Sequence, residues 1–203
     1  MEEGMPESQH EALRADAKQN RERILEGARV ALADSSDASL NSIAKSAGVG
    51  TGTLYRHFPN REALVLAVYR HEIQELADLA PKLLEEHPPI VALRLWFDRL
   101  AHYGRIKHGL ADVLHAATSD GLVGESYGPV VGAITLLLKS CEQAGSIRRD
   151  VDPDDVLLMV GFLWRIDAKG DWEERTGRML DLVMDGLEAT PTGHAASKGL
   201  PGV

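Results

Sequence analysis

The stretch AGVGTGTLYRHFPN, residues 47–60, decides how this chain folds. Its three glycines stand at alternate positions, and a run of Tyr, Arg, His and Phe leads from them to Pro59. The glycines favour a tight turn, because glycine adopts backbone conformations that other residues avoid. Thr51 can cap a short helix that runs to about Phe58, and Pro59 prevents its continuation.

Helical patterns surround this turn on both sides. Apolar residues at helix spacing predict a first helix over about 17–33. Ser39 can cap a second helix, and Gly48 is placed to follow its end. After the turn, Asn60 can cap a long fourth helix that reaches about residue 80. Two short helices joined by a glycine-containing turn, next to longer helices, predict a helix-turn-helix.

The short helix after the turn has an apolar side and a polar side. At 100° per residue, Leu54 and Phe58 lie together, so we expect them to pack against the first two helices. The opposite side offers threonine hydroxyls and methyls, an arginine that can read guanine, and a glycine that allows close approach to a DNA groove. Tyrosine and histidine on its flanks can reach phosphates and fix the register. This side and its flanks consist of Gly52, Thr53, Tyr55, Arg56 and His57.

Charge is distributed unevenly over the chain. The formal net charge is −9, but residues 14–61 hold eight basic residues against five acidic ones. A basic module on an acidic body suits a protein that binds nucleic acid with one end. Arg61 begins the fourth helix, where the helix dipole disfavours a cation. Either a DNA phosphate or the neighbouring Glu62 would offset that cost.

The segment SIAKSAGVGTGTLYRHFPNREALVLAV, residues 42–68, resembles the helix-turn-helix of the tetracycline-repressor-like (TetR) family. The similarity covers residues 20–70 well, although the loop over residues 34–37 lacks the glycine that is common there in the family. The resemblance implies that the short helix lines the major groove, that Tyr55, His57 and Arg61 contact phosphates, and that Ser39 contacts the backbone. The expected DNA-binding residues are Ser39, Lys45, Thr51, Gly52, Thr53, Tyr55, Arg56, His57 and Arg61.

A dinucleotide-binding loop is the competing interpretation of the alternate glycines. That motif follows a strand, whereas the segment before Gly48 has helical spacing, so we reject it. The single cysteine, Cys141, excludes an internal disulfide and is expected to be a small buried side chain. The acidic start MEEGMPESQHE is not a signal peptide, and no run approaches the roughly 18 apolar residues of a membrane span. We therefore expect a cytoplasmic protein without a membrane partner.

The remainder of the chain is also expected to be helical. Pro81 and the run His-Pro-Pro at 87–89 predict breaks. Residues 90–118 predict two helices bent near 104–109, GLVGESYG at 121–128 predicts a loop, and 129–145 predicts a long apolar helix. The last two helices are expected over about 153–168 and 171–188.

The family resemblance also implies a partner and a ligand. In similar proteins the last two helices form a four-helix interface with a second copy, and a two-fold dimer suits a palindromic operator. The expected interface residues are Val156, Leu157, Val160, Trp164, Leu180, Val183 and Leu187. The resemblance further implies a cavity for an unknown small-molecule effector. Its expected lining residues are Trp96, Phe97, Tyr103, Leu114, His115, Tyr127, Met159 and Phe162.

An enzyme or a protein-interaction module is the functional alternative. The pairs Asp98/His102 and Asp112/His115, with His108 between them, could be imagined around a metal ion. The chain lacks the paired Glu-x-x-His motifs that a helical di-metal enzyme would need, so we favour ordinary surface or core histidines. We expect no metal, no cofactor and no catalysis.

The sequence therefore predicts an all-α protein. An acidic, disordered segment over 1–15 precedes a three-helix DNA-binding domain over 16–60 with the helix-turn-helix. A helical bundle over 61–188 binds the ligand and forms the dimer, and the tail over 189–203 is disordered. The expected function is a sequence-specific transcriptional regulator, a homodimeric repressor that a small molecule releases from its operator.

Overall fold

The computed structural model describes residues 7–35, 38–109, 122–164, 166 and 170–188 of the 203-residue chain. Within these residues the regular structure is helical, apart from an isolated antiparallel bridge between Ile147 and Glu188. The all-α prediction is confirmed. The elements are α1 (Glu7–Asp34), α2 (Leu40–Ser46), α3 (Thr51–His57), α4 (Arg61–Glu86), α5 (Pro89–Gly109), α7 (Leu122–Gln143), α8 (Pro153–Met159), the 3-10 helix η2 (Val160–Trp164) and α9 (Trp172–Leu187).

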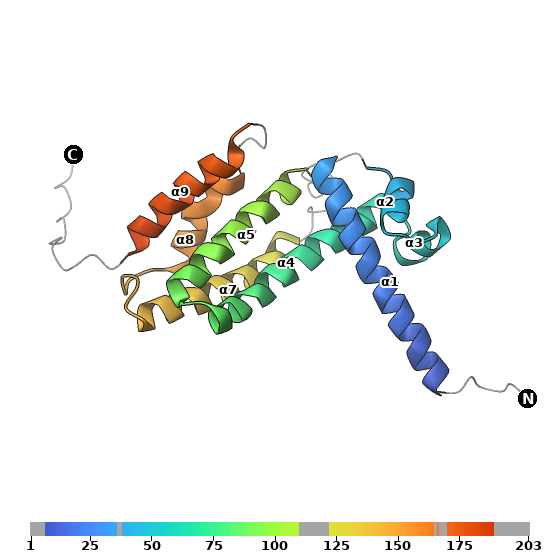
Figure 1. The fold of residues 1–203 in the computed structure, drawn as a ribbon, viewed down its shortest axis with the longest axis horizontal. Helices are drawn as coiled ribbons and strands as arrows, with labels where there is room; N and C mark the ends of the chain where they lie inside the picture. The colour runs from blue at the N-terminus through green and yellow to red at the C-terminus, as the bar shows by residue number, and fades with distance from the viewer. Residues whose placement is uncertain (1–6, 36–37, 110–121, 165, 167–169, 189–203) are drawn as a thin grey trace, which may run out of the picture.

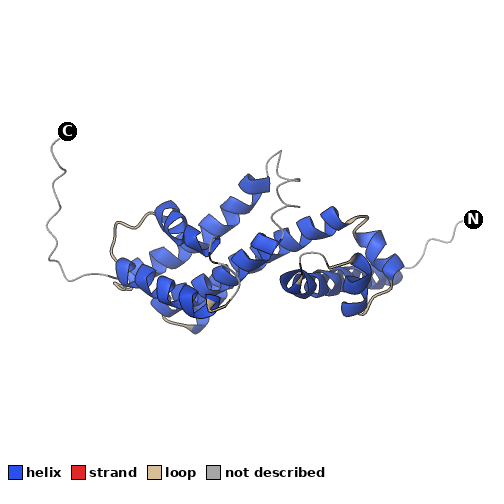
Figure 2. Cartoon of the chain, turned by 90° about the horizontal axis from the view of Figure 1, so that it is seen from above, coloured by secondary structure: helices blue, strands red, loops and turns tan. Residues whose placement is uncertain are grey.

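The helices form a small unit at one end of an elongated molecule and a larger bundle at the other (Figures 1 and 2). In the small unit, α1, α2 and α3 pack on one another. In the bundle, α5 packs on α7, α9 and η2. The long helix α4 belongs to both parts, because it contacts α1 at one end and α5 and α7 along the rest. A membrane-spanning helix is not found among the described residues.

The first helix is longer than its apolar pattern predicts. It begins at Glu7, so residues 7–15 are helical and the disordered segment expected over 1–15 is wrong for that part. Residues 1–6, and the tail expected over 189–203, lie outside the described residues. The buried side chains of α1 start only at Ile24. The apolar pattern therefore could not reveal the polar first half of the helix.

Two prolines and a glycine-rich segment lie inside helices rather than between them. α4 continues through Pro81 to Glu86, and α7 begins at Leu122, so it includes Pro129 and most of the segment expected to be a loop. An internal proline removes one helix hydrogen bond. Ala80 and Leu83, on either side of Pro81, are buried and hold α4 against the bundle. Packing therefore outweighs the local cost of the proline.

The remaining helix boundaries differ less from expectation. α5 continues through the predicted bend to Gly109, and the helix expected after it lies in residues 110–121, outside the described ranges. The single helix expected over 153–168 ends at Met159 and continues as η2. Asp152 caps α8, since its side chain accepts from the Asp154 N–H at 2.8 Å. α9 buries the predicted stripe of Thr176, Leu180, Val183 and Leu187.

Candidate nucleic-acid interface

The turn between α2 and α3 is built as the sequence predicts. The Ser39 hydroxyl accepts from the Ser42 N–H at 3.1 Å and caps α2. Ala47 ends the helix, and Gly48 follows in the left-handed region with φ of 63°. The Gly48 carbonyl also accepts from the Arg23 guanidinium at 3.2 Å. Glycine is needed here, because a Cβ at Gly48 would be strained and would lie 2.9 Å from Arg23 Nη2.

The start of α3 differs from prediction by one residue. Gly50, not Thr51, is the N-cap, and its carbonyl accepts from the Thr53 and Leu54 N–H groups at 2.9 and 3.1 Å. Thr51 is therefore the first helical residue, and its side chain is exposed. At the other end, Phe58 caps α3 and Asn60 caps α4 by accepting from the Ala63 N–H at 2.8 Å.

Burial divides α3 into the two predicted sides. Leu54 is 0% exposed and Phe58 is 4% exposed, and both belong to the apolar core. Thr51, Gly52 and Arg56 are exposed, Tyr55 is 48% exposed, and Thr53 and His57 are half-buried. A Cβ added at Gly52 would meet open space, so the backbone there is accessible from outside. A polar helix face that protrudes in this way can enter the major groove of DNA.

Two arginines of the expected interface also make contacts within the chain. Arg56 Nε donates to the Gly52 carbonyl at 3.2 Å, so its side chain lies along the exposed side of α3. Arg61 is half-buried, and its guanidinium donates to the Ala38 carbonyl in the segment before α2. Arg61 therefore joins the start of α4 to the start of α2. Ser39 and Lys45, the expected contacts on α2, are both exposed.

A buried carboxylate connects the DNA-binding unit to the bundle. Glu72 of α4 is 1% exposed, and its Oε2 accepts from Arg99 Nη2 of α5 at 2.9 Å. Its Oε1 lies 3.6 Å from Arg29 Nε of α1. Arg29 also donates to Glu26 at 2.6 and 2.8 Å, and these bonds lower the pKa of Glu26. We call Arg29, Glu72 and Arg99 the ionic joint, because it links three helices through one carboxylate.

The expected lining residues of a ligand cavity do not all face the interior. Trp96 and Phe97 are fully buried, Tyr103 is 4% exposed, and Phe162 is partly buried. Tyr127 and Met159, at 51% and 46% exposed, do not fit an enclosed lining, so their assignment to it is wrong. The Tyr127 hydroxyl instead donates to the Asp154 carboxylate at 2.8 Å, and both of these side chains lie at the surface. Leu114 and His115 lie outside the described residues.

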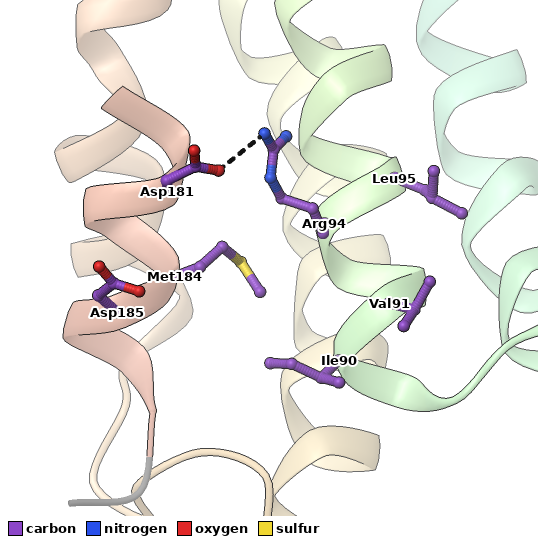
Figure 3. Close-up of a pocket in the computed structure, with 7 residues that line it drawn as sticks. All are labelled: Ile90, Val91, Arg94, Leu95, Asp181, Met184 and Asp185. Atoms are coloured by element: carbon purple, nitrogen blue, oxygen red, sulfur yellow. Dashed lines mark hydrogen bonds and ion pairs between the residues drawn. The ribbon is translucent and has the colours of Figure 1, made fainter. Parts of the chain in front are cut away.

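The buried aromatic residues of α5 pack closely with α4. Trp96 Nε1 donates to the Leu76 carbonyl at 2.9 Å, and the Tyr69 and Tyr103 ring centroids are 5.9 Å apart. Burial and a hydrogen bond with Tyr69 raise the pKa of Tyr103. A hollow of about 370 Å³ lies elsewhere, between α5 and α9, where Asp181 faces Arg94 (Figure 3). The sequence did not predict this hollow.

The predicted dimer residues are mostly covered within the chain itself. Val156, Val160, Leu180, Val183 and Leu187 are each 6% exposed or less, so assigning them to an interface with a second copy is wrong. Leu157 is partly buried, and the side chain of Trp164 is not among those described. The most apolar side of an amphipathic helix usually packs against the core of its own chain, so it is not available to a second copy. Leu158 and Leu182, at 80% and 71% exposed, face outward instead.

The chemistry of a metal enzyme finds no support in the described part of the chain. Asp98 pairs with Arg94, and His102 Nδ1 lies 2.8 Å from the Asp98 carbonyl. The described residues contain no group of three potential metal ligands, while Asp112 and His115 fall outside them. Cys141 is fully buried, and burial raises the pKa of its thiol to about 11, so it is unreactive at neutral pH.

Sequence reasoning missed the ionic joint and the outward leucines. Glu72 could have been noticed, because it lies four residues after Val68 and four before Leu76, on the apolar side of α4. A lone carboxylate in such a stripe indicates a buried ion pair. No comparable signal identifies the partners Arg29 and Arg99, which come from other helices.

A helix-turn-helix that presents a polar, acid-free helix outside an apolar core defines a DNA-binding regulator. Comparison with known proteins agrees. Residues 24–68 match the family model described as bacterial regulatory proteins of the tetR family, and residues 88–189 match the SbtR-like C-terminal domain of transcriptional regulators. The chain belongs to the TetR family of transcriptional regulators, which are not enzymes.

Similar proteins extend over most of the chain. The HTH-type transcriptional repressor Rv1474c of Mycobacterium tuberculosis is 30% identical over 173 residues, which cover 80% of this chain and 90% of that protein. The TetR regulator SCO0520 of Streptomyces coelicolor is 40% identical with a TM-score of 0.78, covering 84% of this chain and 99% of that one. FadR of Bacillus subtilis, solved with stearoyl-CoA, has the same fold at 21% identity and a TM-score of 0.55. The match covers 82% of this chain and 98% of the FadR chain.

Removing the carboxylate of the ionic joint should destabilise the protein. Glu72→Ala leaves Arg29 and Arg99 without their shared partner, but both arginines are about 30% exposed and can be hydrated. We therefore expect a loss of about 1–3 kcal/mol in the free energy of unfolding, below the usual cost of breaking a fully buried pair. Urea denaturation measures it. Glu75→Ala, an exposed change one turn away, is the control, and equal stabilities of the two variants would contradict the prediction.

Proposed function

We propose that this chain is a sequence-specific repressor that binds a palindromic operator as a homodimer and releases it when a small molecule binds. The observation that carries the proposal is the exposed side of α3, held outward by the burial of Leu54 and Phe58. The similar protein Rv1474c is named a repressor, which supports repression over activation. The proposed place of action is the cytoplasm.

The proposal divides the work between two parts of the chain. Residues 16–60 would bind DNA and residues 61–188 would bind the ligand and form the dimer. Thr51, Gly52, Thr53 and Arg56 would meet base edges, and Tyr55, His57 and Arg61 would meet phosphates. Ser39 and Lys45 would add backbone contacts from α2. Six of these residues are exposed, which supports the assignment: Ser39, Lys45, Thr51, Gly52, Tyr55 and Arg56. Thr53, His57 and Arg61 are half-buried, and Arg61 also donates to the Ala38 carbonyl.

A dimer would use the outward side of α8 and α9. η2, which continues α8, packs on α9, and Leu158 and Leu182 project from these two helices with most of their surface exposed. Exposed leucines of this kind favour burial against a second copy. Two-fold symmetry would set the two α3 helices about 34 Å apart, which is the spacing of successive major grooves.

Ligand control would act on the position of α4. The aromatic residues Trp96 and Tyr103 of α5 contact α4, and the ionic joint ties both helices to α1. A ligand that binds better to a form with displaced α3 helices would weaken operator binding, and DNA would weaken ligand binding by the same factor. The stearoyl-CoA complex of FadR supports a ligand site in this fold, without identifying the ligand of this chain.

Substitutions on α3 should separate base reading from phosphate contact. Arg56→Ala should reduce the free energy of DNA binding by about 1–3 kcal/mol and relax the preference at the base pair that the arginine reads. Tyr55→Phe should instead weaken binding to all DNA sequences alike, because it removes a phosphate contact. Electrophoretic shifts on DNA from upstream of the protein's own coding sequence, with single base-pair changes, measure both effects.

Lys82→Gln is the control for these shifts, because Lys82 is exposed near the other end of α4. Arg61→Ala is a poorer probe, since it also removes the bond to Ala38. If the Arg56 and Tyr55 variants bound every duplex as the parent does, the assignment of α3 to the groove would fail.

A charge on the outward side of α9 should abolish the dimer. Leu182→Glu would place a carboxylate in the proposed interface, where its desolvation is costly. Light scattering after size exclusion should then report a monomer with unchanged helix content. Leu136→Glu on α7, where the leucine is 42% exposed, is the control and should remain dimeric. A dimeric Leu182→Glu protein would show that copies associate through another face.

A further inference from the structure

The first half of α1 extends beyond the core of the DNA-binding unit. Its buried side chains are Ile24, Leu25, Ala28 and Leu32, all in the second half. The described side chains at 11 and 14–23 are exposed or half-buried. At 1.5 Å per residue, the residues that precede Ile24 lengthen the helix by about 25 Å. Apolar packing therefore does not explain what this segment contacts.

Three basic residues of this segment lie on one side of the helix. Arg14, Lys18 and Arg21 are spaced by four and three residues, so they form a row, which we call the α1 basic stripe. All three side chains are exposed. The stripe begins beside the DNA-reading helix, because the Arg21 guanidinium lies 5.6 Å from the centroid of the Phe58 ring at the end of α3.

Acidic neighbours neutralise the stripe only in part. Lys18 Nζ is 4.0 Å from Glu22 Oε1, but both side chains are more than half exposed, so the pair is weak. Glu11 lies on the same side one turn nearer the N-terminus, where a carboxylate is favoured by the helix dipole. A row of three cations on a chain of net charge −9 is suited to a polyanion.

The direction of α1 places this stripe beside the expected course of DNA. The first turns of α1 lie at the same end of the molecule as α3, remote from α9 (Figures 1 and 2). In Figure 1, α1 also runs toward the side opposite to α8 and α9. If two copies pair through α8 and α9, the first half of each α1 points away from the two-fold axis, toward the outer ends of the operator.

We propose that the α1 basic stripe binds phosphates of the duplex that flanks the base pairs read by α3. This inference rests on the proposed function and extends the DNA contact beyond the helix-turn-helix. The partner is the backbone of double-stranded DNA, because the stripe starts at α3 and continues from it. Such contacts add affinity and salt dependence without reading sequence.

The test compares two lengths of one operator. A duplex is first selected from a randomised library with the parent protein, then prepared either trimmed to the two half-sites or extended by about ten base pairs, one helical turn, at each end. The test variant is Arg14→Gln/Lys18→Gln, which leaves the Arg21 contact with Phe58 intact. The control, Lys82→Gln/Lys139→Gln, removes two exposed cations from α4 and α7 far from the helix-turn-helix.

We expect the test variant to bind the extended duplex about tenfold more weakly than the parent. The slope of log affinity against log salt should fall by about 0.9 for each phosphate that the variant no longer neutralises. Its affinity for the trimmed duplex should match that of the parent. The control should match the parent on both duplexes. Retained binding to the trimmed duplex also demonstrates that the variant is folded.

Two results would overturn the inference while leaving the proposed function intact. The test variant could bind both duplexes as the parent does, or it could lose affinity equally for both, which would mean that the stripe does not act through flanking DNA. Failure of the parent protein to select any duplex would instead overturn the proposed function, and the inference with it.

Discussion

The burial of Leu54 and Phe58 fixes the rotation of α3 about its own axis. These side chains are four residues apart, so they share one side of the helix, and both are almost fully covered. Burying each side chain contributes about 1.5–3 kcal/mol to the free energy of folding. Any other rotation of this short helix would expose them and lose that stabilisation. Because that side faces the core, Gly52 and Arg56 on the opposite side must face outward, and both are exposed. The DNA-binding surface is thus a consequence of apolar packing on the opposite side.

The position of α3 relative to the bundle depends on polar contacts as well as packing. Arg61 holds the segment before α2, and the ionic joint holds α1 to α4 and α5. Burying a carboxylate is costly unless its partners are well placed, so the joint favours one arrangement of the three helices over others. Under the proposed mechanism, a ligand-induced change in α5 would reach α1 through Glu72 and Arg29. It would thereby alter the placement of the DNA-binding unit.

Sequence patterns predicted the local structure better than the surfaces between elements. Ser39, Gly48 and Asn60 act in the structure as predicted, because caps and tight turns depend on nearby residues. Pro81 was misleading because tertiary packing keeps α4 helical through it. The dimer residues were misassigned because a single helix pattern gives the apolar side but not the body that covers it. Leu158 and Leu182 are exposed in the structure, but no sequence pattern distinguishes them from the buried leucines.

Dimethyl sulfate protection of a bound duplex tests the central claim most directly, because the reagent methylates guanine N7 in the major groove and adenine N3 in the minor groove. If the outward side of α3 occupies the major groove, guanines in two patches should be protected, with the patch centres about one helical turn apart. Adenine N3 within the same patches should remain reactive. Protection confined to adenine N3, or bound protein that protects no guanine N7 in a guanine-containing site, would contradict the account.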